Sequence, residues 1–380
     1  MTLAPETRQE HPYFMYDAIT GQPEAMALML ERHAVGAREV AESLASRRNI
    51  YIVGIGTSWH AVLVAEHWFR RFAGQRIQVQ GWHSFEFCSY PPALGPEDAV
   101  VIISHRGTKT YSFLALELAR ERGAYTVAVT STDPGPRLQV ADVSFHTVSP
   151  ERSSAFTISY TTALTVLALL ASDLGEITGE APGSITAGGG GGAGDAARLK
   201  DSLLDVPAAV ADITDREADI AAVAERFANR QRFISVGWGP NTGNAYEVAL
   251  KIKETSASDC EGLQVEQLLH GPFCSLDDSC LVTLIAPPGP GYERSLDIAR
   301  ASAAAGAPVW ALVQAGDEDL SSLASASFPM KPVPEIWSPL ACVAPLQLFT
   351  YHLALQRGKH PDLFQQDNPK QAAARVHYNL

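Results

Sequence analysis

Helical spacing places a lysine between two carboxylates in the second half of the chain. Glu247, Lys251 and Glu254 lie four and three residues apart in the stretch NAYEVALKIKETSAS, so a helix would carry them on one face. Further on, His270 precedes Gly-Pro, which favours a fixed turn over a helix interior. A carboxylate and an imidazole are the usual pair for moving protons between carbon and oxygen. Glu254 and His270 are therefore candidate acid–base groups, although a surface Glu–Lys pair would show the same spacing.

Two turns in the first half could bind an anion. The stretch YIVG leads into GIGTS, which ends at Ser58, and VVIIS leads into SHRGTKT, which ends at Thr110. Glycines allow close approach, while hydroxyls, cations and helix N-termini hold phosphate. The first turn is not a dinucleotide fingerprint, because the third glycine and the later acidic residue are absent. A capped turn or a plain surface loop is the alternative in each case. The candidate binding residues are Gly56, Thr57, Ser58, Ser104, His105, Arg106, Gly107, Lys109 and Thr110.

A third loop follows the last predicted strand of the first half and reads SPERSSAFT. Ser154 and Thr157 could donate hydrogen bonds to a ligand, and Glu151 could accept one from a sugar hydroxyl. An ordinary capped loop fits these residues equally well.

The elements that must position these residues repeat along the chain. Short β-branched runs alternate with helix-length stretches at similar intervals in both halves, which indicates parallel sheets covered by helices on both faces. The runs are Ile50–Val53, Ala99–Ser104, Tyr125–Thr130, Asp142–Val148, Arg232–Val236, Cys280–Ala286, Pro308–Val313 and Ser327–Val333. We predict an α/β protein with two doubly wound parallel-sheet domains in tandem, each with its ligand outside the carboxyl ends of its strands. Helical segments, about Tyr13–Arg47 and Leu340–Gln356, should flank them.

A run of five glycines, Gly188–Gly192, predicts the domain boundary, because glycine loses much backbone entropy in a regular element. The expected organisation is an N-terminal helix with the first domain over 1–177, a linker over 178–197, and the second domain with its helical tail over 198–380.

Composition excludes several classes of function. The 29 Lys and Arg against 42 Asp and Glu give a net charge of −13, which argues against nucleic acid as a partner. The most apolar run, Thr162–Ala171, is about half the length that spans a bilayer, and the N-terminus shows no secretory signal. Five cysteines without a CxxC pair indicate neither a disulfide framework nor a zinc site. We therefore expect a cytoplasmic protein that binds no membrane.

Taken in order, these motifs resemble the sugar isomerase (SIS) domain family in its double-domain form, whose domains are flavodoxin-like. The likeness is greatest to the isomerase half of glucosamine-6-phosphate synthase and to related deaminases and deglycases of amino-sugar phosphates. It rests on HPYFMYDAITGQPEAM, GIGTS, SHRGTKT, ALKIKETS, LLHGP, PLQLFTYHLAL and DNPKQAAAR, which cover nearly the whole chain.

The resemblance implies a role for each candidate residue. Ser58 and Ser104 match positions that bind the sugar phosphate, and Glu254 matches the carboxylate that moves a proton between C1 and C2. Lys251 matches a lysine that assists near the substrate oxygens. His270 matches the histidine that opens the sugar ring, which the neighbouring subunit of a homodimer supplies. No metal or cofactor is implied.

Four departures separate this chain from the synthase. Arg106 and Lys109 replace small hydroxyl residues of an SQSGET loop, so charge would hold the phosphate more than hydroxyls do. Phe156 stands where a serine contacts the sugar phosphate, and Gln267 where glutamate is frequent. We interpret Arg375 as the counterpart of a lysine that forms a Schiff base; a guanidinium cannot form one, but it could hold a substrate oxygen.

The expected function is that of a phosphosugar isomerase or an amino-sugar-phosphate deaminase or deglycase, acting on a hexose 6-phosphate derivative by ring opening and C1/C2 proton transfer. Deamination or deglycation is favoured over simple aldose–ketose isomerisation. A glutaminase domain is not expected in this chain, so synthesis from glutamine is not expected either. The alternative is a regulatory protein that binds a phosphosugar without turnover, which the changes at Phe156 and Arg375 would favour.

Overall fold

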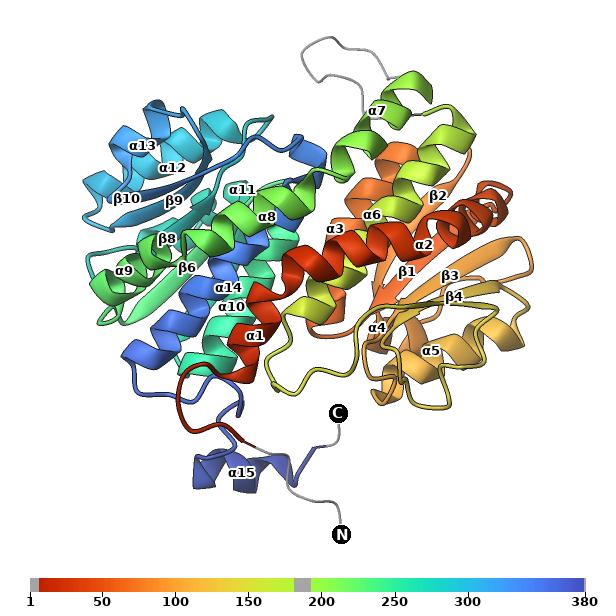
Figure 1. Ribbon diagram of the computed structural model, residues 1–380, viewed down its shortest axis with the longest axis horizontal. Helices are drawn as coiled ribbons and strands as arrows, with labels where there is room; N and C mark the ends of the chain where they lie inside the picture. The colour runs from red at the N-terminus through yellow and green to blue at the C-terminus, as the bar shows by residue number, and fades with distance from the viewer. Residues whose placement is uncertain (1–6, 181–192, 379–380) are drawn as a thin grey trace. The chain divides into compact units, whose positions relative to one another are not determined.

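The computed structural model describes residues 7–180 and 193–378 and contains two five-stranded parallel sheets (Figure 1). Their strand orders are β2-β1-β3-β4-β5 and β10-β9-β8-β6-β7. The strands are β1 (Asn49–Gly54), β2 (Gln78–His83), β3 (Asp98–Ile103), β4 (Tyr125–Thr130), β5 (Val143–His146), β6 (Arg232–Gly237), β7 (Asp259–Gln264), β8 (Cys280–Ile285), β9 (Val309–Gln314) and β10 (Ala326–Met330). The prediction of two doubly wound α/β sheets is confirmed.

Helices connect the strands. They are α1 (Phe14–Thr20), α2 (Gln22–Ala45), α3 (Thr57–Phe72), α4 (Ser84–Ser89), α5 (Thr110–Glu121), α6 (Ile158–Thr178), α7 (Ala193–Leu203), α8 (Val206–Asp215), α9 (Glu217–Phe227), α10 (Asn241–Ser256), α11 (Val265–Leu269), α12 (Tyr292–Ala304), α13 (Asp319–Leu323), α14 (Ser338–Gln356) and α15 (Pro369–Arg375). The predicted N-terminal helical segment is two helices, and the predicted C-terminal one lies within α14.

Every predicted strand is present, but β2 and β7 were not predicted. Both lie at sheet edges, where residues are only partly buried, and their sequences QVQGWH and DCEGLQ contain no apolar run. The central strands β3 and β8 are buried at every position, as expected of parallel strands covered on both faces. Burial of each large apolar side chain there contributes about 1.5–3 kcal/mol.

The chain divides into two compact units whose boundaries differ from those expected. The first-sheet unit comprises Pro23–Pro150 and Ile158–Pro207; the second-sheet unit comprises Met1–Gln22, Glu151–Thr157 and Ala208–Leu380. The N-terminal segment and the third loop therefore belong with the second sheet, although they come from the first half of the sequence.

The predicted linker, 178–197, falls mostly outside the described residues, since 181–192 are not described. Of its described residues, Thr178 ends α6, and α7 begins at Ala193. Helical structure thus occupies both ends of the predicted linker.

Helix α6 is about twice as long as the apolar run Thr162–Ala171, which was compared above with the length that spans a bilayer. By length and composition alone, this 21-residue helix could cross a membrane, and 94% of its most apolar window is buried. Residues from Ser159 to Gly175 are buried without interruption, so α6 is an interior helix whose apolar composition matches its packing.

Equivalent glycines end β1 and β6 and permit the tight entry into the next helix. A Cβ on Gly54 would lie 2.5 Å from the carbonyl oxygen of Ser58, and one on Gly237 would lie 2.3 Å from that of Asn241. Such contacts are far below van der Waals separation, so each turn requires glycine. Both turns lie at the carboxyl edges of their sheets, where ligands of this fold class bind.

Candidate active site

In the second-sheet unit, α10 carries three charged side chains on one face. Helix α10 follows β6, and the Lys251 Nζ lies 3.4 Å from Glu247 Oε1 and also donates to Glu254 Oε2. The side chains of Glu247 and Lys251 are 0% and 1% exposed, whereas that of Glu254 is 11% exposed. The predicted shared face is therefore present, and Glu254 is the carboxylate that reaches the surface.

The charges around Lys251 keep it protonated. Its complete burial disfavours the ammonium form, but the carboxylates of Glu247, Glu254 and Glu151 outweigh this effect and raise the pKa of Lys251 above its usual value. The cluster thus holds a fixed positive charge beside a carboxylate, as a developing oxyanion requires. Sequence reasoning placed Glu247 on this face without giving it a role.

His270 ends the short helix α11, which follows β7, the neighbour of β6. Its Nδ1 lies 2.7 Å from the Glu266 carbonyl oxygen and 3.5 Å from a Glu266 carboxylate oxygen, and the imidazole is 73% exposed. Within the described chain, the hydrogen bond and ion pair of this side chain are with Glu266. A proton on Nδ1 shared with that carbonyl leaves Nε2 of the neutral ring as an acceptor.

In the first-sheet unit, β1 and β3 are neighbours, so their following turns share one edge. Gly56 has φ 62° and precedes α3, which begins with Thr57 and Ser58. The hydroxyl of Ser58 makes no hydrogen bond within the described chain. The first turn therefore offers a hydroxyl at the positive end of a 16-residue helix.

The second turn is fixed by the loop after β4. The backbone N–H of Ser104 donates to Val129, and Gly135 donates to the carbonyl of Arg106 at 2.9 Å. Gly107, at φ 65°, leaves no room for a Cβ beside Leu138. The Ser104 hydroxyl has no hydrogen-bond partner among the described residues. Lys109 and Thr110 then start α5, so the predicted anion-binding groups occupy a strand-to-helix turn.

His105 contributes no positive charge to this turn. Its burial, followed by the nearby charge of Arg106, lowers the pKa of the imidazole to about 4. At neutral pH the ring is uncharged, so any cationic attraction comes from Arg106 and Lys109.

The third loop is a closed structure within the second-sheet unit. Both carboxylate oxygens of Glu151 accept from the Thr157 N–H, and the Thr157 hydroxyl also donates to this carboxylate. The N–H of Ser154 donates to the Asp362 carbonyl. Thr157 and Glu151 are thus engaged with each other, and Phe156 adjoins them in the loop. These contacts favour the capped-loop interpretation for Thr157.

Arg375 ends α15, and within the described chain the hydrogen bond and ring contact of its side chain are both with Phe364. The guanidinium carbon lies 4.3 Å from the Phe364 ring centre, and Nη2 donates to the Phe364 carbonyl. The structure does not bring Arg375 into contact with Lys251 or Glu254. Gln267 lies on α11 and donates its backbone N–H to the Gln264 side chain.

Sequence reasoning missed Asp362, a buried carboxylate that accepts from the backbone N–H groups of Phe14 and Met15. It joins the N-terminal helix, the third loop and the tail within the second-sheet unit. No local signal distinguishes such a long-range cap from a surface aspartate.

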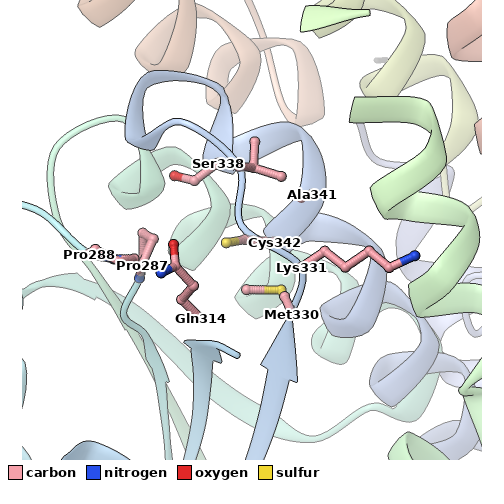
Figure 2. A pocket seen from close by; sticks show the side chains of 9 residues that line it. Pro287, Pro288, Gln314, Met330, Lys331, Ser338, Ala341 and Cys342 are labelled. Carbon is pink, nitrogen blue, oxygen red and sulfur yellow. The ribbon is translucent and has the colours of Figure 1, made fainter. Parts of the chain in front are cut away.

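A pocket at the carboxyl edge of the second sheet contains none of the predicted site residues. Its lining is Pro287, Pro288, Gln314, Met330, Lys331, Val333, Ser338, Ala341 and Cys342. Figure 2 shows the Cys342 and Met330 sulfurs facing its centre, whereas Lys331 points away, toward its ion pair with Asp212. Among the described residues, no group of three or more His, Cys, Asp or Glu side chains is arranged to hold a metal ion.

Residues 43–172 match the SIS domain model, so this part of the chain belongs to the SIS domain family. The chain is 32% identical over 362 residues to glutamine–fructose-6-phosphate aminotransferase (isomerizing) of Thermococcus kodakarensis, covering 95% of this chain and 58% of the relative. It is 30% identical over 364 residues to the enzyme of the same name from Pyrococcus horikoshii, again covering 95% and 58%. The chain therefore spans less than two thirds of these relatives.

Solved structures show the same fold. The C-terminal domain of glucosamine-fructose-6-phosphate aminotransferase from Francisella tularensis aligns with a TM-score of 0.81 at 19% identity, covering 94% of this chain and 99% of that one. Tagatose-6-phosphate ketose/aldose isomerase from Escherichia coli aligns with 0.73 at 20% identity, covering 94% and 97%. Glucosamine-6-phosphate deaminase from Thermotoga maritima aligns with 0.69 at 19% identity, covering 92% and 97%. These likenesses establish the architecture of both sheets.

Proposed function

We propose that the protein is a phosphosugar-processing enzyme of the isomerase type, which acts on a hexose 6-phosphate derivative and releases an amine from an amino-sugar phosphate. The observation that carries this proposal is the α10 cluster, in which a partly exposed carboxylate, Glu254, is paired with a buried ammonium. The similarity to the aminotransferases supports the substrate class.

Binding of the phosphate is assigned to the two turns after β1 and β3. Ser58 and Ser104 offer hydroxyls, the starts of α3 and α5 offer backbone N–H groups, and Arg106 and Lys109 offer charge. A dianionic phosphate suits this mixture because charge-assisted hydrogen bonds are about twice as strong as neutral ones.

Ring opening is assigned to His270. Its unprotonated Nε2 accepts the proton of the anomeric hydroxyl and returns a proton to the ring oxygen as the C1–O5 bond breaks. The exposure of this imidazole fits delivery to a second copy of the chain, so a homodimer with shared sites is part of the proposal.

Proton transfer is assigned to Glu254. The carboxylate removes the proton from C2 of the open-chain amino sugar and returns it to C1, while Lys251 stabilises negative charge on O1. In the same conversion O1 gains a proton and the C2 amine nitrogen loses one, so that the C1 aldehyde becomes an alcohol. The product is an imine at C2, which water hydrolyses to the ketose phosphate and ammonia. In deglycation the amine is attached to C1. The proton then moves from C1 to C2, and hydrolysis of the resulting C1 imine releases that amine.

The proposal is tested by proton exchange in heavy water. Fructose-6-phosphate, glucose-6-phosphate and glucosamine-6-phosphate are incubated separately with the protein, deuterium at C1 and C2 is followed by NMR, and ammonia is assayed. Deuterium uptake with ammonia release supports deamination; uptake alone supports aldose–ketose isomerisation. Thermal stabilisation by these ligands without uptake would favour the regulatory alternative. The cytoplasmic location stays a prediction.

A further inference from the structure

Two consecutive residues of the C-terminal tail have left-handed backbone conformations although neither is glycine. Phe364 has φ 53° and Gln365 has φ 56°. A side chain makes this region unfavourable, and residues held there cost on the order of 1–3 kcal/mol each. Contacts elsewhere in the tail must therefore stabilise this turn.

Arg375 provides those contacts on one side of the turn. Its guanidinium lies over the Phe364 ring and donates to the Phe364 carbonyl, so one side chain holds both the ring and the backbone of the strained residue. Helix α15, capped by Asn368 and with Pro369 at its first position, carries Arg375 to this place.

Gln365 connects the turn to the helix that carries the proposed base. Its side-chain amide donates to the carbonyl of Thr255 at 3.1 Å, near the end of α10. That carbonyl is one of the last four in the helix, which lack partners inside the helix. The Thr255 hydroxyl donates to the Lys251 carbonyl at 2.9 Å, and Glu254 is the preceding residue. Thr255 itself is fully buried.

We propose that Arg375 and Gln365 are positioning residues of the reaction, and that Arg375 does not contact the substrate. Arg375 holds the left-handed turn, the turn presents the Gln365 amide to Thr255, and the capped end of α10 fixes the Glu254 carboxylate. This inference rests on the proposed role of Glu254 as the base. It replaces the sequence-based interpretation of Arg375 as a partner of a substrate oxygen.

The kinetic test compares Arg375→Ala, Gln365→Ala and the double variant, with Gln371→Ala, an exposed residue of α15, as control. Each single variant should lower kcat about tenfold with KM unchanged, because proton transfer and not phosphate binding is affected. The double variant should equal either single one, because both residues act through one contact. If only Arg375→Ala lowers kcat, or if the two effects multiply, Arg375 acts on the substrate and the proposal is wrong.

Amide hydrogen exchange tests the same inference without turnover. Loss of the cap in either variant should speed exchange at the end of α10, residues 252–257, about tenfold relative to wild type and to the control. Faster exchange in a protein inactive on every sugar phosphate would contradict the proposed function but would retain the structural link from Arg375 and Gln365 to the end of α10. Unchanged exchange would overturn the positioning role, whatever the activity.

Discussion

The two sheets have the same strand order, yet the turns that follow equivalent strands carry different side chains. Ser58 in the first-sheet unit and Asn241 in the second occupy the same place, four residues after the glycine that ends the strand. Among the described residues the Ser58 hydroxyl has no hydrogen-bond partner, whereas Asn241 is fully buried and bonded to Ser338 and Asn244. The same backbone turn therefore places an available hydroxyl in one unit and a buried, hydrogen-bonded amide in the other.

The next loop shows the contrast more directly. The N–H of Ser104 donates to Val129 at 3.0 Å, and that of Ala286 donates to Leu312 at 3.0 Å, so these residues are equivalent. The methyl group of Ala286 stands in place of the Ser104 hydroxyl. Pro287 and Pro288 stand in place of His105 and Arg106, so the sequence APP corresponds to SHR. Proline has no N–H to offer an anion. The fold supplies the edge, and individual side chains decide what it binds.

The helix that follows the edge strand also differs between the two units. Helices α4 and α11 both begin after an edge strand with a side-chain cap, from His83 and Gln264, and both are followed by an exposed C-cap residue. That residue is Tyr90 in one unit and His270 in the other. The candidate acid–base groups of the second-sheet unit thus lie on α10 and α11, whereas the candidate anion-binding groups of the first-sheet unit lie in the turns after β1 and β3.

The largest expected effect comes from removing the base. Glu254→Gln should lower the rate of C1/C2 proton exchange by about 10³-fold, since general base catalysis contributes about 10²–10⁴-fold. Phosphosugar affinity, measured by calorimetry, should stay the same because the residues proposed to bind the phosphate lie in the first-sheet unit. Glu261→Gln, at an exposed position of β7, is the matched control. A loss of affinity in Glu254→Gln would contradict this division between the units.

His270→Ala should slow the reaction of a cyclic substrate about 10²-fold, but it should hardly affect one that is already open-chain. Measuring kcat for both substrate forms checks this. Tyr90→Ala, the equivalent position in the first-sheet unit, should leave both rates unchanged. Equal slowing of both forms by His270→Ala would exclude a role in ring opening.

Ser104→Ala makes this position match Ala286 of the other unit. Loss of one hydrogen bond to a charged group should weaken phosphosugar binding about tenfold. The unphosphorylated sugar should bind as before, and Thr108→Ala, exposed in the same loop, serves as control. Equal weakening for both ligands would show that Ser104 only supports the fold.

The smallest effect is on stability. Because the pKa of His105 is about 4 when folded and about 6.5 when unfolded, the unfolded state binds more protons between these values. The stability is fully present above pH 6.5 and is lost as pH falls toward 4, by about 2 kcal/mol at pH 5. His105→Gln should show a smaller loss between pH 7.5 and 5 in denaturant unfolding. An unchanged pH dependence would contradict the neutral, buried imidazole.

Regular periodicity made much of this fold predictable. The buried central strands gave continuous apolar runs, and the three-and-four spacing of Glu247, Lys251 and Glu254 placed them on one helical face, as the structure has them. Edge strands β2 and β7 gave no such runs, because water reaches part of their surface.

The rest depends on contacts between residues far apart in sequence. The cap that Asp362 gives to Phe14 and Met15, and the closure of the third loop within the second-sheet unit, follow from no local pattern. Likewise, Phe364 and Gln365 adopt a conformation that sequence assigns to glycine. Only tertiary contacts could reveal that Arg375 is held within the tail.

The assignment of Glu151–Thr157 and of the described N-terminal residues through Gln22 to the second-sheet unit limits where this chain can be divided without loss of structure. A cut in the glycine run would yield two pieces, one of which keeps a sheet but loses the helix and loop that complete its unit. Recombination at that point would therefore transfer the second sheet without the N-terminal helix and the third loop that belong to its unit.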